Sequence, residues 1–227
     1  MLETPTPNTL ATPTADGLGQ IEPPAAAQTA SKNSEQDPDG IVVDDAKLRA
    51  TAIRRQRRRG RIADLRKATA EDLIGTIDEN TELFGLTGGQ FSLSELLEVI
   101  LRQTGPARFT VSTWTCANID LDHLERLLST GALTGLRFLI DNKFHRRQPA
   151  IFAKLRALTG DNGLRVLRNH AKFATVTGGR WPVTITTTMN LNKNLRLEQF
   201  GLSTDPELAG FLDGFADSLF ATKKPPR

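Results

Sequence analysis

The sequence predicts an α/β fold, a mixed β-sheet flanked by helices. Between residues 91 and 222, short segments rich in β-branched and aromatic residues alternate with segments whose leucines recur at helical spacing. This alternation is typical of a sheet with helices packed on its faces. Residues 1–68 are polar or basic and show neither pattern, so we expect the sheet to lie in the C-terminal part of the chain.

Residues 1–42 are expected to form a disordered tail. They are rich in Thr, Pro, Ala, Gln, Gly and Asp and contain few large apolar side chains. Such a segment cannot bury enough surface to offset the entropy lost on ordering it. A role in recruiting a partner has no motif to support it, and the tail is interpreted as dispensable.

Residues 43–68 are predicted to form a basic arm or helix. Between Lys47 and Lys67 the chain has ten cationic side chains and one acidic residue, Asp64. A solvated helix or a linker would share this composition, but the density of arginines favours binding to the phosphates of nucleic acid. The proposed contacts are Arg54, Arg55, Arg57, Arg58, Arg59 and Arg61.

A helical connector is expected over residues 69–90, because Thr69 followed by Asp72 is a typical helix start. The main domain, residues 91–222, then begins with a helix capped by Ser92 and Glu95. The later predicted strands are 109–114, 136–140 and 164–167, and the later predicted helices are 120–130, 150–158 and one from Pro206. A polar loop spans 141–148, and the last helix is expected to bury Leu208, Phe211, Leu212, Phe215 and Leu219.

A β-hairpin is predicted from Lys172–Thr177 and Val183–Thr188, which are separated by a Gly-Gly turn. Side chains two residues apart on a strand share a face, so His170 and Lys172 are expected to lie together, with Asn190 beside them. An imidazole that can attack phosphorus, a fixed cation and an amide donor suit a phosphodiester centre. A lone His-x-Lys is a weak signal, however, and most histidines do no chemistry.

The combination of His170-x-Lys172, Asn190 and Glu198 resembles the active-site half-motif of the phospholipase D superfamily. The resemblance covers roughly residues 91–220, including the order of strands and helices. Two positions depart from the motif. Thr177 stands where the family has Asp, as in the tyrosyl-DNA phosphodiesterase branch, which also lacks this Asp; Thr188 keeps the hydroxyl of the family's Ser.

The resemblance implies a phosphodiesterase that needs neither metal nor cofactor. His170 would form a phosphohistidine, Lys172, Asn190 and Thr188 would hold the non-bridging oxygens, and Glu198 would orient the imidazole. The family's full site uses two such halves and this chain has one, which implies a homodimer. The basic segment makes nucleic acid the expected substrate, DNA rather than RNA. The alternative is an inactive nucleic-acid-binding module that uses the arginines.

Composition excludes several other classes of protein. The single cysteine, Cys116, cannot form an internal disulfide, and the three histidines have no metal-site spacing. No segment has the length and hydrophobicity of a membrane span, and the first residues lack the pattern of a signal peptide. A cytoplasmic protein without membrane contact is therefore expected.

Overall fold

The computed structural model of the protein describes residues 61–62, as backbone alone, and residues 69–221. Every described residue belongs to one unit of the chain. The expected tail, residues 1–42, and most of the basic segment, including Arg54, Arg55, Arg57, Arg58 and Arg59, lie outside the described residues.

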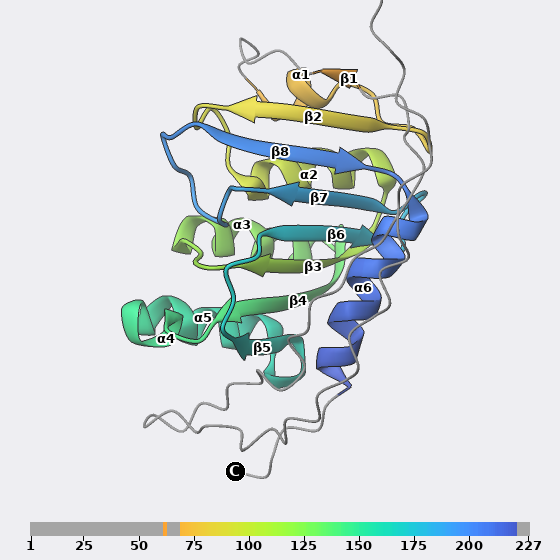
Figure 1. The fold of residues 1–227 in the computed structure, drawn as a ribbon. Helices are drawn as coiled ribbons and strands as arrows, with labels where there is room; N and C mark the ends of the chain where they lie inside the picture. The colour runs from red at the N-terminus through yellow and green to blue at the C-terminus, as the bar shows by residue number, and fades with distance from the viewer. Residues whose placement is uncertain (1–60, 63–68, 222–227) are drawn as a thin grey trace, which may run out of the picture. The chain divides into compact units, whose positions relative to one another are not determined.

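The described residues form one mixed sheet of eight strands in the order β1-β2-β8-β7-β6-β3-β4-β5 (Figure 1). The strands are β1 (Arg61–Ile62), β2 (Glu82–Thr87), β3 (Ala107–Thr113), β4 (Leu133–Asp141), β5 (Leu164–Leu167), β6 (Phe173–Thr177), β7 (Val183–Thr187) and β8 (Glu198–Ser203). The predicted α/β class, with helices packed on a mixed sheet, is confirmed.

Strand direction determines which side chains can meet. Strands β3, β4 and β5 are parallel, whereas β6 runs antiparallel to β3, β7 antiparallel to β6 and β8 antiparallel to β7. The ends of β3, β4, β5 and β7 therefore lie at the same edge as the beginnings of β6 and β8. We call this edge the carboxyl edge. It is the left-hand edge of the sheet in Figure 1.

The helices are α1 (Ala70–Ile74), α2 (Leu93–Thr104), α3 (Asn118–Ser129), α4 (Phe144–Arg147), α5 (Pro149–Thr159) and α6 (Pro206–Phe220), with a 3-10 turn at Asp161–Gly163. The capping box that begins α2 is present, since Ser92 Oγ accepts from the amide of Glu95 and Glu95 Oε2 accepts from the amide of Ser92. No helix in the described part of the chain is both long and apolar enough to cross a bilayer.

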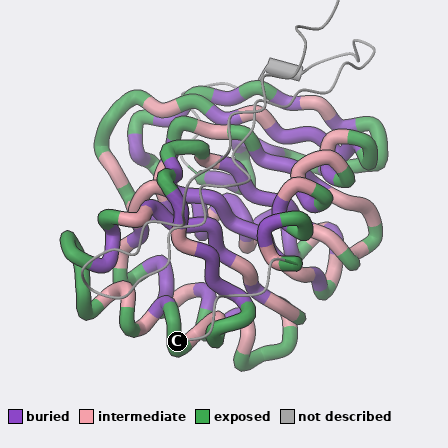
Figure 2. The backbone as a smooth tube through the Cα atoms, turned by 60° about the horizontal axis from the view of Figure 1, so that its bottom comes forward, coloured by how far each residue is buried: buried purple, intermediate pink, exposed green. Residues whose placement is uncertain are grey.

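The two faces of the sheet are covered differently. Helices α2, α3 and α5 pack on one face and enclose the main hydrophobic core, while α6 crosses the opposite face (Figure 1). Figure 2 shows that the backbone in the middle of the molecule is largely buried. Alternate residues of β3 and β6 serve the two sides: Phe109 and Val176 belong to the main core, whereas Thr110 and Thr175 contact α6.

Several expected boundaries were wrong. Glu82–Thr87, assigned to a helical connector, is a full strand that pairs along its length with β8. The polar loop 141–148 contains α4. Arg61–Ile62, expected in an arm or helix, is a short strand parallel to β2. In each case pairing or packing with distant parts of the chain decides the local structure.

The predicted burial on α6 was also partly wrong. Leu219 is buried, but Leu208, Phe211, Leu212 and Phe215 are only partly covered. The face that meets the sheet is instead Ala209, Asp213, Ala216 and Leu219. The alanines allow α6 to lie close to the sheet, and the carboxylate of Asp213 accepts hydrogen bonds from Thr110 of β3 and Thr175 of β6.

Candidate active site

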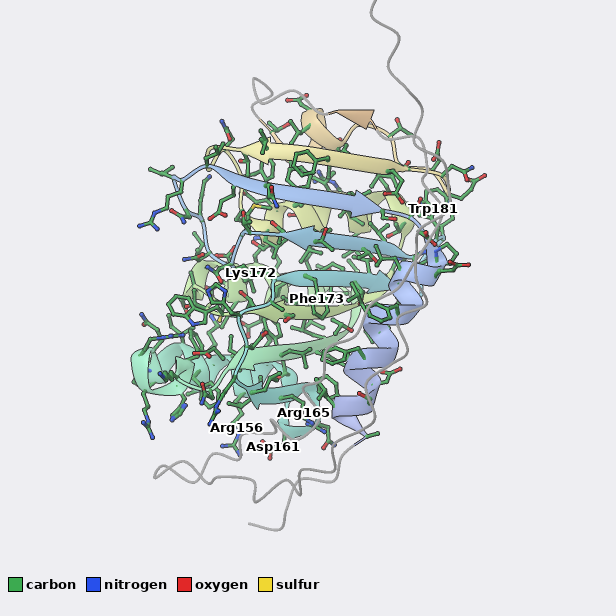
Figure 3. All side chains as sticks on the ribbon, in the orientation of Figure 1. Arg156, Asp161, Arg165, Lys172, Phe173 and Trp181 are labelled. Atoms are coloured by element: carbon green, nitrogen blue, oxygen red, sulfur yellow. The ribbon has the colours of Figure 1, made fainter. Side chains whose placement is uncertain are left out.

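His170 lies at the carboxyl edge, in the loop that joins β5 to β6. Its side chain is exposed, and the Nζ atom of Lys172 lies 3.5 Å from its Nδ1. The same ammonium donates to the main-chain carbonyl of His170 at 3.0 Å. The structure therefore brings His170 and Lys172 together just before β6, whose first residues follow Lys172 in Figure 3.

A buried asparagine, Asn169, fixes the loop that presents His170. Its Nδ2 donates to Ser112 Oγ at 3.0 Å and to the carbonyls of Thr113 and Leu139 at 3.2 and 2.9 Å. Its Oδ1 accepts from the amide of Ala171 at 3.0 Å. These bonds join the ends of β3 and β4 to both neighbours of His170. The sequence analysis missed this role, although a short polar side chain such as Asn169, two residues after the strand Leu164–Leu167, is a signal for hydrogen bonding to nearby backbone.

Lys172 is tied to the sheet through its backbone, because its carbonyl accepts from the amide of Thr187 at 3.1 Å. Partial burial lowers the pKa of its ammonium, and the nearby carboxylate of Glu198 acts in the opposite direction. Glu198 thus favours the charged form of Lys172. A partly desolvated cation interacts more strongly with an anion than a fully hydrated one does.

Glu198 is positioned differently from the expectation that it would orient the imidazole. Its Oε1 accepts from Asn194 Nδ2 at 3.3 Å, and its charge acts on Lys172. Both residues are described, and no hydrogen bond joins Glu198 to His170. The group that faces Nδ1 of His170 is the ammonium of Lys172.

Asn190 and Thr188 follow β7 and belong to the same edge. Asn190 Oδ1 accepts from Thr113 Oγ1 at 3.4 Å, at the end of β3, which leaves its amide NH₂ as a donor. Thr188 Oγ1 accepts from the amide of Gln199 at 2.9 Å, so this hydroxyl is part of the connection between β7 and β8. Asn190 can therefore act as a donor more readily than Thr188.

An aromatic and a cation missed by the sequence analysis lie beside His170. The ring of Trp114 is centred 6.0 Å from the ring of His170. The guanidinium carbon of Arg147 lies 3.8 Å from the centroid of the Trp114 ring. Trp114 directly follows β3, and Asp141, which pairs with Arg147, is the last residue of β4. Their place at the carboxyl ends of parallel strands was the signal that could have identified this part of the site.

Thr177, which replaces the Asp of the motif, lies at the far end of β6. Its hydroxyl donates to Asp213 of α6 at 3.2 Å. A strand of this length separates it from Lys172 by about 16 Å. The replacement therefore removes no carboxylate from the surroundings of His170.

The remaining candidates do not join this site. His123 pairs with Glu98 between α3 and α2, and the ring of His145 is buried 5.8 Å from that of Phe152. Burial, with a smaller contribution from Asp120, raises the pKa of the Cys116 thiol to about 12, so it is no thiolate nucleophile. In the described part of the chain no cluster of three or more His, Cys, Asp or Glu could hold a metal ion.

Comparison with known proteins gives little similarity. No family model and no curated protein matches the sequence. A solved structure that matches is the polyphosphate kinase from Porphyromonas gingivalis, with 12% sequence identity and a TM-score of 0.46 over 64% of this chain. The match covers 27% of the kinase chain. The functional assignment therefore depends on the geometry of the site.

Proposed function

We propose that the protein is a metal-independent phosphodiesterase acting on nucleic acid through a phosphohistidine intermediate. The observation that supports this most directly is the exposed imidazole of His170 with the ammonium of Lys172 at 3.5 Å from its Nδ1. A nucleophile and a cation at one point of a sheet edge match the needs of phosphoryl transfer, in which negative charge must be held while phosphorus is attacked.

Each group at the edge has a defined role in this proposal. Lys172 and the NH₂ group of Asn190 bind the non-bridging oxygens of the scissile phosphate, with Thr188 assisting. Glu198 keeps Lys172 charged against the effect of its partial burial. Asn169 holds the main chain on both sides of His170 and is a positioning residue.

In the first step a ring nitrogen of His170 attacks phosphorus. A P–N bond forms and the P–O bond to the leaving group breaks, while a second histidine gives its proton to the leaving oxygen. In the second step water attacks phosphorus, the same second histidine takes the proton from water, and the P–N bond breaks. The products are an alcohol and a phosphate monoester, and His170 is regenerated.

We propose that the second histidine comes from another copy of the chain. The whole sequence has three histidines, and His123 and His145 are held away from the site by Glu98 and by packing against Phe152. We therefore propose a homodimer in which two carboxyl edges meet across a two-fold axis, so that one His170 attacks phosphorus and the partner's His170 protonates the leaving oxygen.

Nucleic acid is the proposed substrate, and DNA is favoured over RNA. The arginines at positions 54, 55, 57, 58, 59 and 61 support a polyanionic substrate, because such a cluster attracts phosphate chains at moderate salt. That these arginines contact nucleic acid is part of the proposal.

One observation favours the alternative of a binding module without catalysis. A catalytic imidazole is usually oriented by a carboxylate. Here Glu198 accepts a hydrogen bond from Asn194, and its charge raises the pKa of Lys172. In this alternative Lys172 and the arginine segment bind nucleic acid, and His170 performs no chemistry.

The two possibilities are separated by cleavage assays on labelled DNA and RNA in the presence of EDTA. We expect cleavage that His170→Ala abolishes and that the control His123→Ala retains, with a dimer in sedimentation equilibrium. A wild-type protein that binds DNA but leaves it intact would establish the binding module. A monomer that cleaves would contradict the proposed dimeric mechanism.

A further inference from the structure

We infer that Arg147 is a second phosphate-binding position of the site and holds the phosphate next to the scissile one on the same strand. The inference rests on the proposed function and adds to it. It implies that the ligand is an extended polyanionic chain and not an isolated phosphodiester. The chemistry described above gives no role to Arg147.

Arg147 is fixed in place before any ligand arrives. Its Nη2 donates to the carbonyl of Trp114 at 3.1 Å and pairs with Asp141 Oδ1 at 3.1 Å. Its guanidinium also lies over the ring of Trp114, with the guanidinium carbon 3.8 Å from the ring centroid. A planar cation held in this way loses little conformational entropy when it binds an oxyanion.

The guanidinium keeps donors for a ligand. Both contacts with Asp141 and Trp114 use Nη2, and among the described residues no hydrogen bond is made by Nη1 or Nε of Arg147. The side chain is 33% exposed, whereas that of Asp141 is 10% exposed. The carboxylate therefore supports the arginine from the protein side, and the remaining N–H groups are accessible to phosphate oxygens.

The distance from His170 suits a neighbouring phosphate. Trp114 contacts both residues, with its ring centroid 6.0 Å from the ring of His170 and 3.8 Å from the Arg147 carbon. The guanidinium carbon is thus at most roughly 10 Å from the imidazole, while the charges of one nucleic-acid strand recur about every 3.4 Å along the axis. A strand whose phosphate is bound at His170 places another phosphate within reach of Arg147.

Tryptophan fluorescence can report this position separately from the arginine segment. The chain has two tryptophans, Trp114 beside Arg147 and Trp181 in the turn between β6 and β7, at the opposite end of the sheet in Figure 3. In a Trp181→Phe, His170→Ala background, emission comes from Trp114 alone and DNA is not cleaved. Binding of a single-stranded thymidine oligonucleotide is then measured over a range of salt concentrations.

Arg147→Met is expected to weaken binding reported by Trp114 roughly tenfold, and the slope of log K against log salt should fall in magnitude by about 0.7, the value for one phosphate contact on a single strand. Arg147→Lys, which keeps the charge, should retain the slope. Arg102→Met removes an exposed arginine at the end of α2, near the opposite edge, and should change neither quantity. Circular dichroism checks that each variant is folded.

Three outcomes would overturn the inference. An unchanged slope with Arg147→Met means that no phosphate contact is lost. If Arg147→Met weakens binding of the oligonucleotide but not of an abasic chain of the same length, Arg147 stacks on a base and does not bind a phosphate. If Arg102→Met weakens binding as much as Arg147→Met does, the effect comes from the net charge of the protein and not from a contact at Arg147. Failure of the proposed catalysis would be a separate result. If the wild-type protein leaves DNA intact while Trp114 still reports binding that depends on Arg147, the proposed phosphodiesterase activity is wrong but the phosphate-binding position at Arg147 stands.

Discussion

The two ends of strand β6 hold charged groups in opposite ways. At its far end Asp213 is buried and accepts from three threonines, Thr110, Thr175 and Thr177, while pairing with Arg108 and Arg137. At the carboxyl edge His170 is exposed, and among the described residues the ammonium of Lys172 has only the carbonyl and the ring of His170 within hydrogen-bond distance. Both ends contain cations and polar groups. At the Asp213 end these groups bond to one another, whereas the ammonium of Lys172 can still donate to a ligand.

The difference separates stability from function. A buried charge that is fully bonded stabilises the position of the helix carrying it, and removing it exposes several unmet partners at once. A cation with donors left over contributes little to folding but can bind an incoming anion. We therefore expect substitutions at the Asp213 end to affect unfolding, and those at the His170 end to affect activity.

Replacement of Asp213 by Ala should have the largest effect on stability. It leaves Arg137, whose side chain is 15% exposed, and Arg108 without their central carboxylate. We expect a loss of about 3–5 kcal/mol in the free energy of unfolding, measured in urea. The matched control is Asp217→Ala, one turn away on the same helix and paired with the same Arg137 but 62% exposed, which should cost less than about 1 kcal/mol. Similar losses in the two variants would contradict the proposed network.

The same carboxylate predicts a dependence of stability on pH. Burial raises the pKa of Asp213, but the hydrogen bonds from Thr175 and Thr110 and the charges of Arg137 and Arg108 outweigh it, so the pKa is lowered in the folded state. Its contribution is therefore complete above the unfolded pKa of about 3.9 and is lost as the pH falls through the folded value. The stability difference between wild type and Asp213→Asn should narrow below about pH 4. A difference that stays constant down to acid pH would contradict this assignment.

Asn169→Ala should affect both properties, because Asn169 belongs to the core and also positions the loop of His170. The substitution removes four hydrogen bonds, three from Nδ2 and one to Oδ1, and leaves buried partners unmet. We expect a loss of roughly 2–3 kcal/mol in the free energy of unfolding, together with reduced cleavage. Asn169→Asp, which keeps the acceptor for the amide of Ala171, should recover part of the positioning. Full activity in Asn169→Ala would show that the hydrogen bonds of Asn169 are not needed to position the loop of His170.

Two glycines with similar φ angles allow a test of packing at the carboxyl edge. Gly89 has φ +91° and Gly105 has φ +87°, but a methyl group at Gly89 would lie 2.3 Å from the carbonyl oxygen of Asn194, whereas nothing lies within 4 Å at Gly105. Gly89→Ala should therefore cost about 1–3 kcal/mol more than Gly105→Ala in thermal unfolding. It should also reduce activity, since Asn194 bonds Glu198. Equal effects would mean that the connection between β7 and β8 adapts freely.

The smallest expected effect is electrostatic. Glu198→Gln removes the charge that opposes the effect of burial on Lys172, so the pKa of Lys172 should fall further below its ordinary value. The change is measured by NMR titration of the Nζ resonance, with Glu125→Gln, on the far helix α3, as the control. A Lys172 pKa that does not move would place Glu198 outside the site.

The course of the chain was predictable where local signals are strong, and the site was predictable only in part. The capping box of Ser92 and Glu95 and the hairpin of β6 and β7 follow from short patterns in the sequence. Strand β2 was missed because its identity depends on pairing with β8, more than a hundred residues later. His170 and Lys172 were expected to share a face of a strand, but both precede β6, and the hydrogen bond from Lys172 Nζ to the carbonyl of His170 brings them together. The position of Arg147 depends on Trp114, directly after β3, and on Asp141, the last residue of β4.

The central claim is that His170 contributes to catalysis and not to folding. The direct measurement compares wild type and His170→Ala in EDTA, with the DNA cleavage rate and the urea midpoint determined on the same preparations. We predict that the rate falls at least about a thousandfold. Because His170 is exposed, the free energy of unfolding should change by less than about 0.5 kcal/mol. Cleavage that persists in the variant, or loss of activity that simply follows loss of folded protein, would contradict the account.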